Sequence, residues 1–397
     1  MQPLKGLTVV TLEHAIAAPF ATRQLADLGA RVIKIERPGV GDFARGYDQR
    51  VRGLASHFVW TNRSKESLTL DVKHREAAAL LQRLVLEKAD VVVQNLAPGA
   101  AARLGLSFDA LKTRRPDLIV CDISGYGDDP AAPGPYRDKK AYDLLIQSES
   151  GFLSVTGSEA EPAKAGISIA DIAAGMYAYS NILAAVLQRR IDGQGRRIDV
   201  SMLESMAEWM GFPLYYTFDG AEPPPRAGAA HATIYPYGPF ATGDGRTLML
   251  GLQNEREWAA FCERVLQQPA LATDPRFAGN AQRNTHRVEL KAVIDAVLGS
   301  LSLQQVSDRL DQAQIANAQV NDMAGLWAHP QLAARGRWRQ VDSPAGALPA
   351  LLPPGSWSDG DPRLDAIPAL GQHTEAILGE LGVDAAGIAA LREAGAI

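Results

Sequence analysis

One aspartate in the sequence stands where a carboxylate could act as a nucleophile. The spacing from Ser168 to Asp171 fits a capping box at the start of a helix predicted for residues 169–190. In the first turn the helix dipole favours the charged form of a carboxylate, so we expect Asp171 to stay ionised and nucleophilic at neutral pH. Three small residues, 173–175, follow it and leave room for a ligand or another backbone. The same spacing suits an aspartate that only caps the helix, and the pattern alone leaves both interpretations open.

Basic side chains gather near the ends of predicted strands. They are Lys34, Arg37, Arg45, Arg63, Lys65, Arg103, Lys139 and Lys140. In an open α/β sheet the carboxyl ends of the strands form the ligand crevice, where Lys and Arg can bind phosphate groups. For any single residue a solvated surface charge is the more common role, but the group as a whole favours an anionic ligand.

Other kinds of site find little support. Residues 39–44 match G-x-G-x-x-A, but in a dinucleotide-binding turn the glycines follow the first strand, and that turn here, residues 13–19, contains none. The seven histidines show no metal-binding spacing, and Cys121 and Cys262 form no C-x-x-C pair. A G-x-S-x-G elbow is absent. We therefore expect no resident metal or dinucleotide and no acyl-serine chemistry.

The elements that must position these residues alternate between strand and helix. Strands are predicted at 7–12, 31–36, 67–71, 90–95, 118–123 and 196–200, and helices at 20–28, 75–89, 169–190 and 202–218. This alternation favours a parallel sheet covered by helices on both faces. A linker rich in Pro and Gly is predicted at 220–230. A smaller domain follows, with a strand at 247–252 and helices at 255–267, 286–299 and 302–312, before two terminal helices at 373–381 and 385–394.

The composition limits the class of protein. With 397 residues and 46% hydrophobic content, the chain suggests two or three domains with a large core. The net charge of −5 and the pI near 5.9 argue against a general nucleic-acid surface. The N-terminus lacks a basic-then-apolar signal pattern, and no stretch of about 18 uninterrupted apolar residues occurs. We expect a cytoplasmic protein that binds neither nucleic acid nor a membrane.

Several blocks, taken in chain order, resemble the family III CoA-transferases, the CaiB/BaiF family that includes formyl-CoA transferase. They are LKGLTVVTLEHAIAAPFATRQLADLGARVIKIERPGVGD, NRSKESLTLD, QNLAPGAAARLGL, KKAYD, ISIADIAAGMYA, GQGRRIDVSMLES and LGQHTEAILGELG. The resemblance implies an α/β fold in which residues 1–220 form the N-terminal part of a large Rossmann-like domain with a parallel sheet. Residues 221–330 would form a linker and a smaller α/β domain, and residues 331–397 would return to the large domain. It also implies an interlocked ring homodimer.

The resemblance further implies roles for individual residues. Asp171 corresponds to the family's covalent nucleophile and would carry an aspartyl-CoA thioester. The implied CoA-binding residues are Ala15, Ile16, Arg37, Leu70, Asn95, Leu96, Arg103 and Lys140, the three cations pairing with phosphates. Tyr142 and Asp143 resemble a pair that lines the reaction site, and backbone N–H groups near Asp171 are expected to stabilise oxyanions. Acyl-CoA and a small carboxylic acid would be the substrates, with no permanently bound cofactor.

The substrates that the resemblance implies depend on one departure from the pattern of formyl-CoA transferase. Where formyl-CoA transferase has a glycine-rich lid, this chain reads RAGAAHATIYPYGPF, so the lid role would fall to residues around His231 and Tyr235. This block resembles members that move CoA from succinyl-CoA to short dicarboxylates such as itaconate, mesaconate or glutarate. Arg45, Arg63 or Arg226 could hold the second carboxylate, and the spacing does not choose among them.

Three alternatives remain at this stage. Formyl-CoA:oxalate transfer is one. α-Methylacyl-CoA racemase is another, but racemisation needs a second base before the aspartate of the AYD block, and this chain has Tyr142 there. A catalytically silent CoA-binding protein is the third, and it would not need an ionised Asp171.

Overall fold

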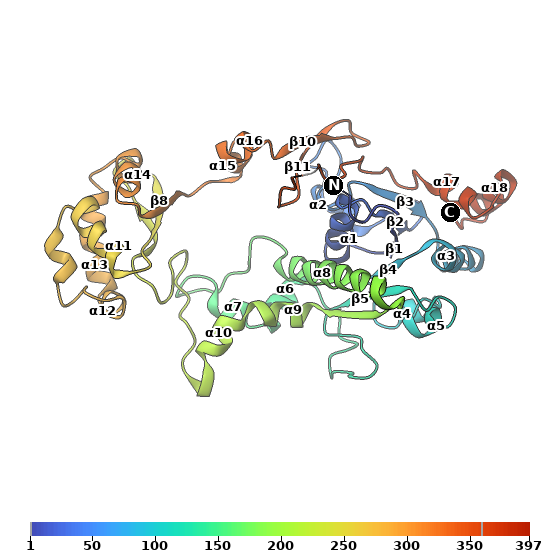
Figure 1. The fold of residues 1–397 in the computed structure, drawn as a ribbon, viewed down its shortest axis with the longest axis horizontal. Helices are drawn as coiled ribbons and strands as arrows, with labels where there is room; N and C mark the ends of the chain where they lie inside the picture. Colours follow the sequence, from blue (N-terminus) through green and yellow to red (C-terminus); the bar gives the residue numbers. More distant parts are fainter. Residues whose placement is uncertain (1, 359) are drawn as a thin grey trace. The chain divides into compact units, whose positions relative to one another are not determined.

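The computed structural model describes residues 2–358 and 360–397, which fold into two compact units (Figure 1). The first unit consists of Met1–Ser150, Ala165–Gly211 and Leu332–Ile397, and the second of Gly151–Lys164 and Phe212–Gln331. The chain therefore leaves the first unit twice and returns to it each time.

A six-stranded sheet forms the centre of the first unit. Its strands are β1 (Thr8–Leu12), β2 (Arg31–Glu36), β3 (Lys65–Thr69), β4 (Val91–Gln94), β5 (Ile119–Ser124) and β6 (Arg197–Ser201). Their spatial order is β3-β2-β1-β4-β5-β6, and every neighbouring pair is parallel, which confirms the predicted sheet. The order reverses between β1 and β4, so the loops after these strands flank the crevice where open α/β sheets bind ligands.

Helices cover this sheet. They are α1 (Ala17–Asp27), the 3-10 helix η1 (Phe43–Gly46), α2 (Ser56–Thr61), α3 (Arg75–Lys88), α4 (Ala100–Arg103), α5 (Phe108–Lys112), α6 (Asp143–Glu149), α8 (Ile169–Asp192), α9 (Met202–Trp209), α17 (Thr374–Glu380) and α18 (Ala385–Glu393). Apolar residues of α3, α17 and α18 share one buried core with β1–β5. The antiparallel pair β10 (Trp338–Val341) and β11 (Leu348–Leu351) precedes α17, which is tied to β3 where Thr374 Oγ1 accepts a hydrogen bond from the N–H of Thr69.

Helix α8 packs along α1 and against β5 and β6 (Figure 1). Its length and apolar composition would also suit a membrane span, but residues along its inner face, among them Ala170, Ala174 and Ile182, are buried in the first unit, as in a core helix. Gly175 permits the close contact with α1, because a Cβ there would lie 2.7 Å from the carbonyl oxygen of Ala17. The small residues after Asp171 thus admit another backbone.

The second unit has a core of its own, which contains Trp258, Phe261 and Phe277. Its sheet is antiparallel, in the order β7 (Tyr237–Ala241), β8 (Thr247–Gly251) and β9 (Ala316–Gln319). Its helices are α7 (Phe152–Val155), α10 (Gly211–Tyr216), η2 (Phe218–Gly220), α11 (Glu255–Ala260), the π-helix η3 (Phe261–Val265), η4 (Pro269–Thr273), α12 (Asn280–Thr285), α13 (Arg287–Leu298), α14 (Leu303–Gln312), α15 (Met323–Trp327) and α16 (Pro330–Ala334), the first residue of α10 and the last three of α16 belonging to the first unit.

Some elements differ from those expected from sequence. The single helix predicted for 202–218 is two helices, α9 and α10, because Gly211 is a weak helix former and Pro213 lacks the N–H that a continuous helix needs. Strands β7 and β9 were not predicted. The first contains Gly and Pro, the second is made of Ala, Asn and Gln, and both form by pairing with β8.

We predict that alanine has opposite effects on stability at two helical glycines, one at the contact between α1 and α8 and one with open space around it. Gly175→Ala should lower the free energy of unfolding by roughly 1–3 kcal/mol, because its Cβ meets backbone that must move. Gly379→Ala in α17 is the matched control. A Cβ there has no heavy atom within 4 Å, so this variant should gain up to about 1 kcal/mol from helix propensity. Urea unfolding measures both, and equal effects would contradict the close packing.

Candidate active site

Asp171 lies in the first turn of α8, but the predicted capping box does not form there. Ser168 is the N-cap residue, and its side chain makes no capping hydrogen bond. Instead, Asp143 Oδ1 accepts hydrogen bonds from the N–H groups of Ala170 (2.8 Å) and Asp171 (3.3 Å). The helix is thus capped by a carboxylate from α6, far away in sequence, and the capping role is not taken by Asp171.

Asp143 is held in this position by a buried glutamine. Gln147 Nε2 donates to Asp143 Oδ2 at 2.7 Å, and Gln147 Oε1 accepts from the N–H of Ala165 at 2.9 Å. Gln147 is fully buried. Because both oxygen atoms of Asp143 accept hydrogen bonds, this carboxylate is fixed beside the first turn of α8.

Burial, and after it the negative charge of Asp143, raise the pKa of Asp171 to about 7. The expectation that the helix dipole keeps Asp171 fully ionised at neutral pH is therefore wrong. Desolvation and a like charge outweigh a dipole contribution of about 0.3–1 kcal/mol. A carboxyl group that titrates near neutrality can still give up its proton, and the resulting carboxylate is poorly solvated and hence reactive.

The same cap occupies the backbone donors that were expected to stabilise an oxyanion. The N–H groups of Ala170 and Asp171 are directed to Asp143, and the N–H of Ile172 donates to the carbonyl oxygen of Ser168. In this arrangement they serve the start of the helix, so an oxyanion has to be stabilised by other donors.

Two tyrosines belong to the surroundings of Asp171. Tyr142 is the N-cap residue of α6 and is 71% exposed. Tyr47 follows η1, and burial together with the charges of Asp42 and Asp171 raises its pKa. Sequence reasoning missed Tyr47. The signal that could have found it is an aromatic residue in the loop after β2, at the ligand edge of the sheet.

The residues implied to bind CoA lie in the first unit, in segments that follow strands of the sheet. Ala15 and Ile16 follow β1, Arg37 follows β2, Leu70 follows β3, Asn95 and Leu96 follow β4, Arg103 ends α4, and Lys140 lies between β5 and α6. The cations among them, Arg37, Arg103 and Lys140, are exposed, whereas Ile16 and Leu70 are buried. The structure thus leaves the three cations accessible to an anion, and their role in binding stays a prediction.

Several other basic residues are used inside the protein rather than for an external anion. The pairs are Lys34 and Lys65 with Glu13, Arg63 with Asp27, Arg45 with Glu36, and the exposed pair Lys139 with Glu149. Buried cations need such partners because an isolated buried charge is very costly. Arg45 donates twice to Glu36, each time at 2.7 Å, and is therefore poorly placed to bind a second substrate carboxylate.

His231 and Arg226 lie in the second unit. Nδ1 of His231 accepts hydrogen bonds from two backbone N–H groups, so in the neutral ring the proton is on Nε2. The ring stacks on Tyr237 with centroids 5.3 Å apart. Arg226 donates to two backbone carbonyl groups of the same unit. His231 thus presents one N–H from a fixed ring, and its part in a lid stays a prediction.

The raised pKa of Asp171 predicts a pH-dependent gain in stability when its charge is removed. Its pKa is higher in the folded than in the unfolded chain, so the contribution of Asp171 to stability falls as the pH rises from about 4 to about 7. Asp171→Asn should escape this loss and become more stable than wild type by on the order of 1–3 kcal/mol at pH 8, with no such gain at pH 4. Urea unfolding across this range tests it, and parallel stability curves would contradict it.

Comparison with known proteins identifies the family. The CoA-transferase family III matches residues 4–374. The chain is 33% identical to the succinate–glutarate CoA-transferase of Agrobacterium fabrum, over 96% of each protein. It is 31% identical to the succinyl-CoA:mesaconate CoA-transferase of Haloarcula marismortui, over 97% of this chain and 98% of that protein.

A solved structure supports the same family. A CaiB/BaiF family protein from Brucella suis superposes with a TM-score of 0.82 at 34% identity, over 96% of this chain and 99% of that chain. The match therefore extends across both units at the level of sequence and of fold. The chain belongs to CoA-transferase family III.

Proposed function

We propose that the protein moves CoA from an acyl-CoA, succinyl-CoA in particular, to a free carboxylic acid, with Asp171 as the covalent relay. The observation that carries the proposal is the carboxyl group of Asp171 at the start of α8, whose pKa burial and Asp143 raise to about 7. The family supplies the reaction class. A poorly solvated carboxylate that forms near neutral pH is well suited to attack a thioester.

The relay consists of four exchanges at Asp171. Its carboxylate attacks the donor's thioester carbon, breaks the C–S bond and gives a mixed anhydride with CoA thiolate. The thiolate attacks the aspartyl carbonyl carbon, which forms the aspartyl-CoA thioester and releases the donor acid. The acceptor carboxylate attacks this thioester, giving a second anhydride and CoA thiolate. Attack of the thiolate on the acceptor's acyl carbon releases the new acyl-CoA and restores Asp171. Because every intermediate is an activated acyl group, water must be excluded as a competing nucleophile.

The protein's other groups have supporting roles. The exposed cations Arg37, Arg103 and Lys140 would pair with the phosphates of CoA, while Leu70 and Leu96 would flank its apolar parts. Because Asp143 occupies the backbone donors of α8, the phenolic O–H of Tyr47 is a donor that we assign to an oxyanion.

The acceptor that we propose is a short dicarboxylate such as glutarate, mesaconate or itaconate. Relatives support this, since the names of those from Agrobacterium fabrum and Haloarcula marismortui specify glutarate and mesaconate, and one from Chloroflexus aurantiacus specifies D-citramalate. An acetyl-CoA:oxalate CoA-transferase of Acetobacter aceti is 34% identical over 84% of each protein, so oxalate belongs among the acids tested. Arg45 and Arg63 pair with carboxylates inside the protein, so both are poorly placed to bind the second carboxylate of such an acid.

Transfer through Asp171 is tested by mass spectrometry. With succinyl-CoA alone, the wild-type protein should gain the mass of CoA less one water, and with added glutarate, mesaconate or itaconate it should make the matching acyl-CoA. Asp171→Ala should gain no mass and lose at least about 10³-fold in kcat/KM.

The matched control is Asp143→Asn, which keeps an oxygen to accept from the N–H groups of Ala170 and Asp171 but removes the like charge. This variant should form the adduct. The midpoint of the rise in its transfer rate with pH should lie at a lower pH than in wild type, because removing a neighbouring negative charge lowers the pKa of Asp171. Transfer that survives in Asp171→Ala would overturn the proposal. Loss of the α-proton of a chiral 2-methylacyl-CoA to solvent, without transfer, would show a racemase instead.

The assembly that we propose is a homodimer, in the interlocked ring implied by the resemblance. Large apolar side chains on α8–α10 and η2 are exposed in the single chain, namely Met176, Leu187, Ile191, Trp209, Phe212, Leu214, Tyr215, Tyr216 and Phe218. Such an apolar surface is typical of an interface. Light scattering should give the mass of two chains, and a monomer at micromolar concentration would contradict it.

We further propose that the enzyme is cytoplasmic. In that compartment the buried thiols of Cys121 and Cys262 stay reduced, and cell fractionation tests this proposal.

A further inference from the structure

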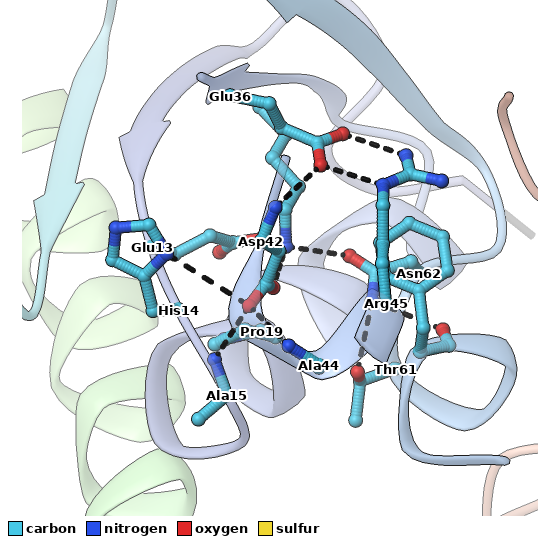
Figure 2. A network of polar contacts seen from close by, with 12 residues as sticks. Glu13, His14, Ala15, Pro19, Glu36, Asp42, Ala44, Arg45, Thr61 and Asn62 are labelled. Carbon is cyan, nitrogen blue, oxygen red and sulfur yellow. Dashed lines mark hydrogen bonds and ion pairs between the residues drawn. The ribbon is translucent and has the colours of Figure 1, made fainter. Parts of the chain in front are cut away.

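Beside the site lies a cluster of charged side chains that the relay does not use. Glu13, Lys34, Asp42 and Lys65, here called the buried anchor, are all within the interior, with side chains of Glu13, Lys34 and Lys65 fully inaccessible. Lys34 Nζ donates to Asp42 Oδ2 at 2.5 Å and lies 3.4 Å from Glu13 Oε1, and Lys65 Nζ donates to Glu13 Oε1 at 2.6 Å. Figure 2 shows the part of this network around Asp42.

Asp42 uses its other oxygen to hold the loop after β1. Asp42 Oδ1 accepts hydrogen bonds from the N–H groups of Ala15 (3.0 Å) and Ala44 (2.9 Å), as Figure 2 shows. Ala15 has a φ of +62°, in the left-handed region that residues with a Cβ rarely adopt. The hydrogen bond to Asp42 therefore stabilises a backbone conformation that alanine alone does not favour.

The same loop is also held by a residue that follows β4, on the other side of the reversal of strand order. The side chain of Asn95, after β4, accepts from the N–H of His14 and donates to its carbonyl oxygen, both at 2.9 Å. Side chains thus join the loops after β1, β2 and β4, at the edge of the sheet where ligands bind in this class of fold.

The charge of Asp42 is itself maintained by the anchor. Burial alone would raise the pKa of Asp42, but the ammonium of Lys34 and several hydrogen bonds hold it well below its usual value. For Lys34, the nearby carboxylates outweigh burial and raise the pKa. Buried ion pairs often add little net stability compared with apolar residues of the same size, so stability is a weak explanation for this pair, and fixing the position of the loop is a better one.

Resting on the proposed function, we propose that Asp42, held by Lys34, is a positioning residue for CoA binding: it fixes the left-handed peptide of Ala15 in the loop that receives the coenzyme. Asp42 itself need not touch CoA. The effect of its loss should appear in the affinity for acyl-CoA rather than in the chemistry at Asp171.

The chain offers a matched control at the other end of α1. Asp27 is likewise a buried carboxylate and pairs with Arg23 and Arg63 at 2.5 and 2.8 Å. A merely structural ion pair should behave like this one, so Asp27→Asn should lower the melting temperature and leave the KM for succinyl-CoA unchanged.

The test compares Asp42→Ala, Asp42→Asn, the double variant Asp42→Ala with Ala15→Gly, and Asp27→Asn. Melting temperature, kcat, the KM for succinyl-CoA and the calorimetric Kd for free CoA are measured for each. Asp42→Ala should raise KM and Kd about tenfold or more while kcat stays within about threefold. Asp42→Asn keeps an acceptor oxygen and should lie between it and wild type. Ala15→Gly should recover most of the loss, because glycine adopts a positive φ without support.

Clear outcomes would overturn the inference. They are a folded Asp42→Ala or Asp42→Asn protein with unchanged KM and Kd, a loss confined to kcat, no recovery on adding Ala15→Gly, or an equal rise in KM for Asp27→Asn. If Asp42→Ala does not fold, the comparison of Asp42→Asn with Asp27→Asn decides. Failure of the proposed function looks different, because wild type itself would then transfer no CoA, whereas the calorimetric Kd would still report on the anchor.

Discussion

Two carboxylates share the start of α8, and the site depends on how they do so. Asp143 accepts the first free N–H groups of the helix, which places its negative charge next to Asp171. The helix terminus would otherwise favour an ionised Asp171. Once Asp143 has taken those donors, Asp171 has burial and a like charge around it, and its pKa rises to about 7. Burial and, after it, the charge of the capping carboxylate thereby turn an ordinary acidic residue into one whose carboxylate forms near neutrality at an energetic cost to the fold.

The rest of the first unit arranges the loops in which the proposed CoA-binding residues lie. Parallel strands place the loops after β1, β2 and β4 at one edge of the sheet, and the strand order reverses between β1 and β4, which is where open α/β sheets bind ligands. The absence of a side chain at Gly175 lets α1 approach α8, which brings the start of α1 next to the helix that carries Asp171. Buried charges then fix the loops themselves, through Asp42 on Ala15 and Asn95 on His14.

Periodicity was enough to predict the parallel sheet, the helix that carries Asp171 and the position of Asp171 in its first turn. It could not predict the state of that residue, because the partner that changes it, Asp143, comes from α6 and meets α8 only in the folded chain. The same limit explains the basic residues. In the sequence, Lys34, Arg37 and Arg45 are all basic residues near the end of one predicted strand. In the structure, Lys34 and Arg45 pair with carboxylates inside the protein, whereas Arg37 is exposed. Which cation faces solvent depends on tertiary contacts that no local pattern contains.

The central claim, that Asp171 is the covalent relay, makes a specific demand on oxygen atoms. When the acceptor carboxylate attacks the aspartyl-CoA thioester, the bridging oxygen of the anhydride comes from the acceptor, and thiolate attack on the acceptor's acyl carbon leaves that oxygen on the aspartate. The most direct measurement is therefore turnover with succinyl-CoA and a dicarboxylate acceptor labelled with ¹⁸O in its carboxyl groups, followed by mass spectrometry of the proteolytic peptides. The account predicts ¹⁸O in the peptide that contains Asp171. Label confined to the released acids and thioesters, with turnover undiminished, would contradict it.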